Sequence, residues 1–401
     1  EEKPKEMVFE PLCVWRSPDD GGEAKGLPPR VVTEMQNDEY GIESAVQVER
    51  PAPASAYSKK SAYVPPLLAR WLRPHQREGV SFLYECTMSL RSFRGNGCIL
   101  ADDMGLGKTL QSITLLYTLL KTSITANNAP TVKRVIIVCP CSLVKNWDNE
   151  IIKWIADGGP GPLPGVTPPR VMALAECDRA EVEKNIDSFC RTNLYSVLIV
   201  SYETLRTHVS RLTSYSESKC DLLICDEAHR LKNRDNQTTR ALNSIPCKRR
   251  VLLTGTPMQN DLEEFYAMVD FTNPGILGSP EQFRKSYLFP ILRGREPDAA
   301  DRQKARMMEC QRQLSEIVNE FILRRVNTVN AQHLPPKLVQ VVNCSLTDVQ
   351  KNMYEYLLAK MEKGNVLEGK KSNCLGWIQC LMKLANHPSL IANEDPSNAI
   401  G

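Results

Sequence analysis

The sequence lacks the features of a membrane protein or a secreted protein. No apolar run approaches the ~18–20 residues of a membrane-spanning helix, and residues 1–5, Glu-Glu-Lys-Pro-Lys, do not resemble a signal peptide. Fourteen cysteines are present, but no two of them form a C-x-x-C pair, and several lie inside apolar runs. Such cysteines are typical of buried free thiols in a reducing compartment. The sequence therefore predicts a soluble intracellular protein.

The chain also has little net charge. Its 50 Lys and Arg against 47 Asp and Glu leave a formal charge of +3. Because this surplus is small, overall charge does not indicate nucleic acid, and any nucleic-acid surface must be a local cluster. A hydrophobic content of 42% and a charged content of 24% are those of an ordinary globular protein. A length of 401 residues predicts two or three structural units.

The most informative stretch is CILADDMGLGKTLQ, residues 98–111. Its apolar start, residues 98–101, predicts a buried strand. Gly105 and Gly107 then remove Cβ atoms from a turn, and residues 110–120 have the spacing of an amphipathic helix. A strand, a glycine loop and a helix in this order can point backbone N–H groups and a helix N-terminus at one anion.

Two side chains at the start of this helix suit a nucleoside triphosphate. Lys108 can reach the outer phosphates, and the hydroxyl of Thr109 can bind Mg²⁺. The generic pattern G-x-x-x-x-G-K-[ST] has glycine where Asp102 stands. At this point a glycine-rich turn that carries an ordinary surface lysine stays open as an alternative.

A second acidic motif lies far downstream. Residues 222–225 are an apolar run that ends on Asp226 and Glu227. A carboxylate at such a strand end is suited to holding Mg²⁺, and the next carboxylate to orienting and deprotonating the attacking water. DEAH alone is a weak signal, but this strand and the upstream GKT make it strong.

Further apolar runs recur with turns and helical patterns between them, which predicts a doubly wound α/β fold with a mainly parallel sheet. The predicted strands are residues 98–101, 135–139, 171–174, 197–201, 222–225 and 251–254. Small hydroxyl residues follow several strand ends and suit phosphodiester oxygens. They are equally compatible with N-caps of the following helices.

Two other features can each be interpreted as functional or as purely structural. Residues 229–250 are the most basic local stretch, which indicates either a nucleic-acid surface or a solvated face. Gln76 has an amide that suits an adenine edge, because it offers a donor and an acceptor. An ordinary solvated helix glutamine is the alternative.

Seven segments together resemble the Swi/Snf-like branch of the superfamily-two helicase-like ATPases, in the order seen there. They are LRPHQREGVSFL, ILADDMGLGKTLQ, VIIVCPCSLVKNW, VLIVSYETLR, LLICDEAHRLKN, RRVLLTGTPMQN and CLMKLANHPSLI. DNQT, NPGILGS and LPPK make the chain most similar to the recombination-repair translocases of the Rad-fifty-four type. In that family an acidic residue is expected at Asp102.

The resemblance covers about residues 66–391 and implies a RecA-like ATPase lobe that translocates along duplex DNA without separating its strands. The expected organisation is an extended N-terminal arm (1–65), the lobe (66–270), a helical protrusion (271–335), and a strand and helices (336–401). The last part would lead toward a second ATPase lobe, for which we find no further set of strands. An extended arm that packs on the globular part and a partly disordered leader are both open for residues 1–65.

The resemblance also implies roles by position. The expected catalytic residues are Lys108, Asp226 and Glu227, with Thr109 and Asp226 as Mg²⁺ ligands. The expected ATP contacts are Gln76, Asp102, Asp103, Met104, Gly105, Leu106, Gly107, Lys108 and Thr109. Coupling of the nucleotide state to DNA is expected from Thr254, Gly255 and Thr256. The expected DNA contacts are Ser142, Ser201, Tyr202, Arg230, Lys232 and Asn260.

The expected partners are double-stranded DNA and either a RecA-like recombinase filament or chromatin, in the nucleus. Two other functions stay open. One is a strand-separating helicase, which a strand-displacement assay would distinguish. The other is a docking module that binds ATP without turnover, although an intact Lys108, Asp226 and Glu227 argue against it.

Overall fold

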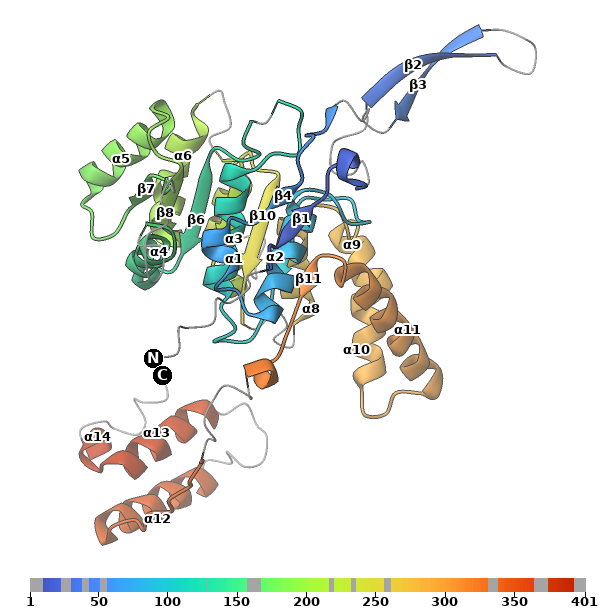
Figure 1. Cartoon of the computed structure of the whole chain (residues 1–401). Coiled ribbons are helices and arrows are strands. Elements are labelled where there is room, and N and C mark those ends of the chain that lie inside the picture. Colours follow the sequence, from blue (N-terminus) through green and yellow to red (C-terminus); the bar gives the residue numbers. More distant parts are fainter. Residues whose placement is uncertain are drawn as a thin grey trace, which may run out of the picture. The chain divides into compact units, whose positions relative to one another are not determined.

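A computed structural model gives the fold (Figure 1). It describes residues 10–22, 30–37, 43–50, 56–127, 129–156, 167–215, 220–231, 236–255, 261–330, 338–363 and 374–392. The chain divides into two units, Glu1–Leu334 and Pro335–Gly401. Among the described residues no helix combines the length and the apolar character needed to cross a bilayer.

The first unit is built on a seven-stranded sheet with the order β11-β5-β10-β9-β6-β8-β7, in which every neighbouring pair is parallel. The strands are β5 (Cys98–Leu100), β6 (Val135–Cys139), β7 (Val171–Ala173), β8 (Val197–Ser201), β9 (Leu222–Cys225), β10 (Arg249–Leu253) and β11 (Ile322–Leu323). The central strands are apolar and buried along their length, as expected for a sheet covered on both faces. The predicted α/β fold is confirmed.

Helices connect the strands and cover the sheet (Figure 1). They are α1 (Pro66–Ala69), α2 (Pro74–Thr87), α3 (Lys108–Lys121), α4 (Val144–Ile151), α5 (Arg179–Arg191), α6 (Tyr202–Thr213), α7 (Gln237–Asn243) and α8 (Leu262–Thr272). Several begin on side-chain caps, with Asp178 capping α5, Ser201 capping α6 and Asp261 capping α8. The caps fix where each helix leaves the strand before it.

The N-terminal region contains two small antiparallel pairs. β1 (Cys13–Trp15) pairs with β4 (Ala62–Tyr63), and β2 (Arg30–Asn37) pairs with β3 (Glu43–Arg50). Trp15 stacks on Tyr57 with a centroid distance of 6.2 Å, and both are buried in the main core. Of the two alternatives for the arm, packing on the globular part therefore applies to residues 10–22 and 56–65. The sequence did not predict strands β1 to β4.

The helical protrusion is shorter than expected. Helix α8 belongs to the core, since Phe265, Met268 and Phe271 are at most 3% exposed. The protrusion consists of α9 (Pro280–Phe283), a π-helical turn (Arg284–Leu288), α10 (Phe289–Arg295) and α11 (Asp301–Val318). The last two helices pack against each other (Figure 1), with Gly294 close to Met307. The chain then returns to the sheet as β11, so residues 271–335 are not one protrusion.

The second unit contains α12 (Asp348–Lys363), α13 (Cys374–Asn386) and α14 (Ser389–Ala392). They enclose a small cluster that includes Leu357, Trp377 and Leu384. The strand expected at the start of this region is absent from residues 338–347, which carry no regular structure. The apolar side chains of Val341 and Val342 are 83% and 77% exposed, because no strand of the described residues pairs with this segment.

Candidate nucleotide site

The loop of residues 101–107, here called the glycine loop, leaves β5 at its carboxyl end, and α3 follows it. Gly105 and Gly107 have φ values of +86° and +80°, in the region that glycine adopts at little cost. Gly107 is also the N-cap of α3, and a Cβ there would lie 2.3 Å from Nε2 of Gln76. Both glycines are thus needed by the backbone, and one of them also makes room for a neighbouring side chain.

Lys108 folds back over this loop. Its Nζ donates to the backbone oxygens of Asp102 (2.7 Å) and Asp103 (3.2 Å). Burial lowers the pKa of Lys108, and the carboxylate of Glu227 is the largest of the opposing influences. A cation that is held by two backbone carbonyls has partners that triphosphate oxygens can replace. The residues present therefore fit a polyphosphate.

Asp226 lies at the carboxyl end of β9 and is held from three sides. Trp147 donates its indole N–H to Oδ2 of Asp226 (2.9 Å), and the backbone N–H of Glu227 donates to Oδ1 (2.9 Å). Tyr202 donates its hydroxyl to the backbone oxygen of Asp226 (2.7 Å). Burial raises the pKa of Asp226, although the bond from Trp147 opposes this. Trp147 is the last residue of the segment VIIVCPCSLVKNW, but it is not among the predicted site residues.

Glu227 has an unusual backbone conformation. Its φ is +49°, which is strained for a residue with a side chain. Its Oε2 lies 3.2 Å from Nδ1 of His229. Backbone strain of this kind is common at functional sites. The conformation directs a second carboxylate to the same edge of the sheet as Lys108.

Three side chains hold the glycine loop, and one of them, that of Gln76, is also a predicted ATP contact. The backbone oxygen of Leu106 accepts from Nε2 of His75 (3.2 Å), Gln76 (3.3 Å) and Gln111 (3.3 Å). The other end of the Gln76 amide accepts from the backbone N–H of Arg73 (3.0 Å). Gln76 therefore supports the glycine loop in this conformation, and its contact with adenine stays a prediction.

Two predicted ATP contacts face the protein interior. Asp102 and Leu106 are fully buried, and the carboxylate of Asp102 is paired with Arg325. Neither side chain is therefore exposed to a ligand in this structure, and an ATP contact through the backbone of these residues stays a prediction. Met104 is 71% exposed, whereas Lys108 and Thr109 are partly buried at the head of α3. The side chains that best fit a nucleotide are therefore those of Lys108 and Thr109.

The predicted coupling segment lies beside the glycine loop. Thr254 is buried, and its backbone N–H donates to the oxygen of Leu100 (3.1 Å). A Cβ on Gly255 would lie 4.0 Å from Nζ of Lys108. This part of the chain is thus placed to respond to a change at Lys108. Thr256 lies outside the described residues.

Two predicted DNA contacts are buried. Ser201 is 3% exposed and caps α6, where its hydroxyl accepts from the backbone N–H of Thr204 (3.0 Å). Tyr202 is 1% exposed. The N-cap alternative accounts for the position of the Ser201 hydroxyl, and a DNA contact for either residue stays a prediction.

The other predicted DNA contacts differ in their surroundings. Ser142 is exposed, and Arg230 pairs with Glu203 at 2.5 Å on the surface. Lys232 and Asn260 lie outside the described residues. Arg250, at the end of the basic stretch, is 8% exposed and donates to the oxygen of Phe271 (2.8 Å). The basic stretch is therefore partly a structural feature of the core.

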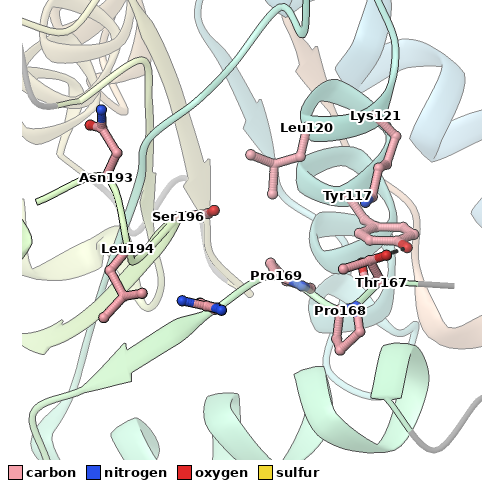
Figure 2. A pocket seen from close by; sticks show the side chains of 10 residues that line it. Tyr117, Leu120, Lys121, Thr167, Pro168, Pro169, Asn193, Leu194 and Ser196 are labelled. Atoms are coloured by element: carbon pink, nitrogen blue, oxygen red, sulfur yellow. Dashed lines mark hydrogen bonds between the residues drawn. The ribbon is translucent and has the colours of Figure 1, made fainter.

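A cavity of about 510 Å³ lies away from this site (Figure 2). It is lined by the last turns of α3, including Tyr117 and Lys121, and by the residues before β7 and β8, including Pro169 and Asn193. It thus opens at the amino ends of the strands, whereas Lys108 and Asp226 lie at the carboxyl ends. Ligands of open α/β sheets bind at the carboxyl ends.

The described residues contain no cluster of three or more His, Cys, Asp or Glu that could cage a metal ion. Proteins often hold Mg²⁺ by one or two side chains together with substrate phosphates. Thr109 and Asp226 are the residues that fit this arrangement.

Comparison with known proteins identifies relatives along most of the chain. The model of the SNF2-related domain matches residues 75–390. The rice (Oryza sativa subsp. japonica) "DNA repair and recombination protein RAD54" is 52% identical over 339 residues, which are 84% of this chain and 33% of that protein. The human (Homo sapiens) "DNA repair and recombination protein RAD54-like" is 41% identical over 389 residues, 93% of this chain and 50% of that protein.

The chain thus spans a third to a half of the length of these relatives. Among solved structures, a Sulfolobus solfataricus SWI2/SNF2 ATPase core in complex with dsDNA is 27% identical and covers 81% of this chain and 60% of its own, with a TM-score of 0.49. That structural likeness is too slight to support an argument.

Proposed function

The chain belongs to the SNF2-related family, and from this premise we propose that it is the first ATPase lobe of a double-stranded DNA translocase acting in homologous recombination repair. One observation carries the ATPase part. Lys108, the first residue of α3 after the glycine loop, and the Asp226–Glu227 pair, just after β9, lie at the same edge of the sheet, where the two carboxylates oppose the lowering of the Lys108 pKa by burial. A phosphate-binding cation and two carboxylates at one strand edge suit hydrolysis of a nucleoside triphosphate.

Each group has a distinct task in this proposal. Lys108 exchanges its two carbonyl partners for oxygens of the β- and γ-phosphates, and the N-terminus of α3 adds its partial positive charge. Thr109 and Asp226 would hold Mg²⁺, which would neutralise charge on the phosphate oxygens. Glu227 orients the attacking water and accepts its proton. Trp147 keeps the Asp226 carboxylate ionised and aimed at the site.

The remaining parts of the proposal depend on the longer protein. Its relatives are named as DNA repair and recombination proteins. We therefore propose that this protein acts on duplex DNA in the nucleus and remodels a recombinase filament or chromatin. A second ATPase lobe belongs to this proposal, because the chain spans at most half of these relatives.

The test is the ATPase rate of the full-length protein with no nucleic acid, single-stranded DNA, duplex DNA and RNA, with Glu227→Gln as the inactive control. Duplex DNA should stimulate most, and a strand-displacement assay should show no unwinding. Equal stimulation by RNA, or efficient strand separation, would overturn the translocase proposal in favour of a helicase. ATP binding without turnover under all four conditions would favour a docking module.

A further inference from the structure

The segment that follows the protrusion runs along the glycine loop as well as along the sheet. The backbone N–H groups of Ile99, Ala101 and Asp103 donate to the oxygens of Phe321 (2.9 Å), Leu323 (2.7 Å) and Arg325 (2.9 Å). The parallel ladder of β5 and β11 therefore continues past the end of the strand. Residues 321–327 are here called the exit strap.

Asp103 makes a second bond to the strap. Its Oδ2 accepts from the backbone N–H of Asn327 at 3.0 Å. The glycine loop is thus bonded to the exit strap through both its main chain and a side chain. Asp103 is at the same time one of the two residues whose backbone oxygens hold Lys108.

Arg325 closes this contact with its side chain. Its Nε and Nη2 donate to the two carboxylate oxygens of Asp102, at 3.0 Å and 2.6 Å, in the two-pronged geometry that makes such pairs strong. Nη2 also donates to Oε1 of Gln111 in α3 (3.0 Å), and Nη1 donates to the backbone oxygen of His75 in α2. One guanidinium therefore joins the glycine loop to both helices that flank it.

The surroundings are shaped for this contact. The Arg325 side chain is 12% exposed and that of Asp102 is fully buried. A Cβ on Gly79 of α2 would lie 1.8 Å from Oε1 of Gln111 and 2.7 Å from Nη2 of Arg325. Any larger residue at position 79 would displace Gln111 or the guanidinium, and the carboxylate of Asp102, which stands where the generic pattern has glycine, receives the guanidinium.

We propose that Arg325 is a positioning residue that holds the glycine loop ready for ATP, and that the exit strap senses whether the loop is occupied. This rests on the proposed ATP site. Lys108 sits on the backbone oxygens of Asp102 and Asp103, the same two residues that hold the strap. When phosphate oxygens bind the ammonium group of Lys108, the peptide groups of Asp102 and Asp103 lose their hydrogen bonds from Lys108 and reorient. The bonds from Asp103 to the strap then change with them.

Hydrogen exchange measured by mass spectrometry on the full-length protein tests the sensing step without requiring turnover. Exchange is followed in residues 99–107 and 321–327, with and without Mg²⁺ and a non-hydrolysable ATP analogue. We expect slower exchange in the glycine loop and a change of at least threefold in the strap. A protected loop with an unchanged strap would refute the inference. An unchanged loop would instead count against the proposed ATP site, and with it against the inference.

Arg325→Lys tests the positioning role, since it keeps the charge but loses the two-pronged bond. We expect the KM for ATP to rise about tenfold while kcat changes less than threefold, and we expect the strap to lose its response to the analogue. Arg324→Lys, at the exposed neighbouring position, is the matched control and should behave as wild type. An unchanged KM in folded Arg325→Lys would show a purely structural role. If that variant fails to fold, the wild-type exchange experiment still decides the sensing step.

Discussion

Replacing Trp147 with Phe tests whether the indole keeps Asp226 ionised. The indole N–H lies 2.9 Å from Oδ2 of Asp226, and Trp147 is 1% exposed, so water cannot readily replace it. A hydrogen bond to a charged acceptor contributes about 1.5–3 kcal/mol and one to a neutral acceptor about 0.5–1.5 kcal/mol. The difference of about 1–1.5 kcal/mol corresponds to about one pKa unit, at 1.36 kcal/mol per unit.

The direction of the effect follows from the burial of Asp226. Burial already raises the pKa of this carboxyl group, and loss of the Trp147 donor should raise it further. Because Mg²⁺ needs the carboxylate, ATPase activity is lost as the pH falls through this pKa. In Trp147→Phe the acid limb of the pH profile should therefore move upward by about one unit.

Protein stability gives a second readout with a defined sign. A carboxyl group whose folded pKa lies above its unfolded value costs stability while it is ionised; this cost begins to shrink as the pH falls to the folded pKa and is gone below the unfolded pKa. Trp147→Phe should therefore lower the Tm more at pH 7.5 than at a pH near the unfolded pKa of the carboxyl group. The change in packing alone would lower it equally at both.

Trp154→Phe is the matched control. Its indole also donates to a carboxylate, Oε2 of Glu150, at 2.7 Å, but outside the proposed site. The ATPase rate at saturating duplex DNA should be measured between pH 5 and pH 9, with the Mg²⁺ dependence at each pH. The reasoning is refuted if folded Trp147→Phe has the same acid limb as wild type and Trp154→Phe.

Four further predictions concern the same unit. Lys108→Ala should abolish ATP hydrolysis because the phosphates lose their cation. Unchanged turnover in the full-length protein would refute the proposed ATP site. Glu227→Gln should bind nucleotide without hydrolysing it, as checked by equilibrium binding and phosphate release; a folded variant that cannot bind would make Glu227 structural. Gly79→Ala should lower the midpoint of thermal unfolding by several degrees, since its Cβ would overlap Gln111. Gly255→Ala is the control and should fold normally, because the described atoms nearest to its Cβ would be 3.6 Å away. Equal melting curves for the two variants would contradict this prediction. Binding to duplex DNA should be nearly independent of sequence and should weaken steeply with salt, and tight salt-resistant binding to one sequence would contradict phosphate contacts.

The core of the sheet could be predicted from the sequence because its strands are continuous apolar runs. β6 and β9 coincide with the predicted ranges, and β10 begins two residues earlier. β11 could not be predicted in this way. It has two residues, both only partly buried, and it is a strand because it pairs with β5, which lies more than two hundred residues earlier. Local pattern carries no information about such a pairing.

A related ambiguity affects individual side chains at the site. A hydroxyl residue after a strand suits a phosphate contact and an N-cap equally well, and only the fold shows that Ser201 is a cap. Asp102 carried a usable signal, since a carboxylate at a loop position that usually requires glycine needs a buried cation. The sequence does not say which of 50 Lys and Arg supplies it.

The identity of the cation that pairs with Asp102 restricts which arginine can act in catalysis. Phosphoryl transfer generally needs a cation on the γ-phosphate beyond the loop lysine and Mg²⁺, and an arginine in that role contributes about 10³–10⁵ in rate. Arg325 is close to the glycine loop, but Nε, Nη1 and Nη2 are all engaged by Asp102, His75 and Gln111. Moving it to the phosphate would leave the buried carboxylate of Asp102 without its charge partner. Arg325 is thus used to shape the loop, and the transition-state arginine of the proposed mechanism must be a residue other than Arg325.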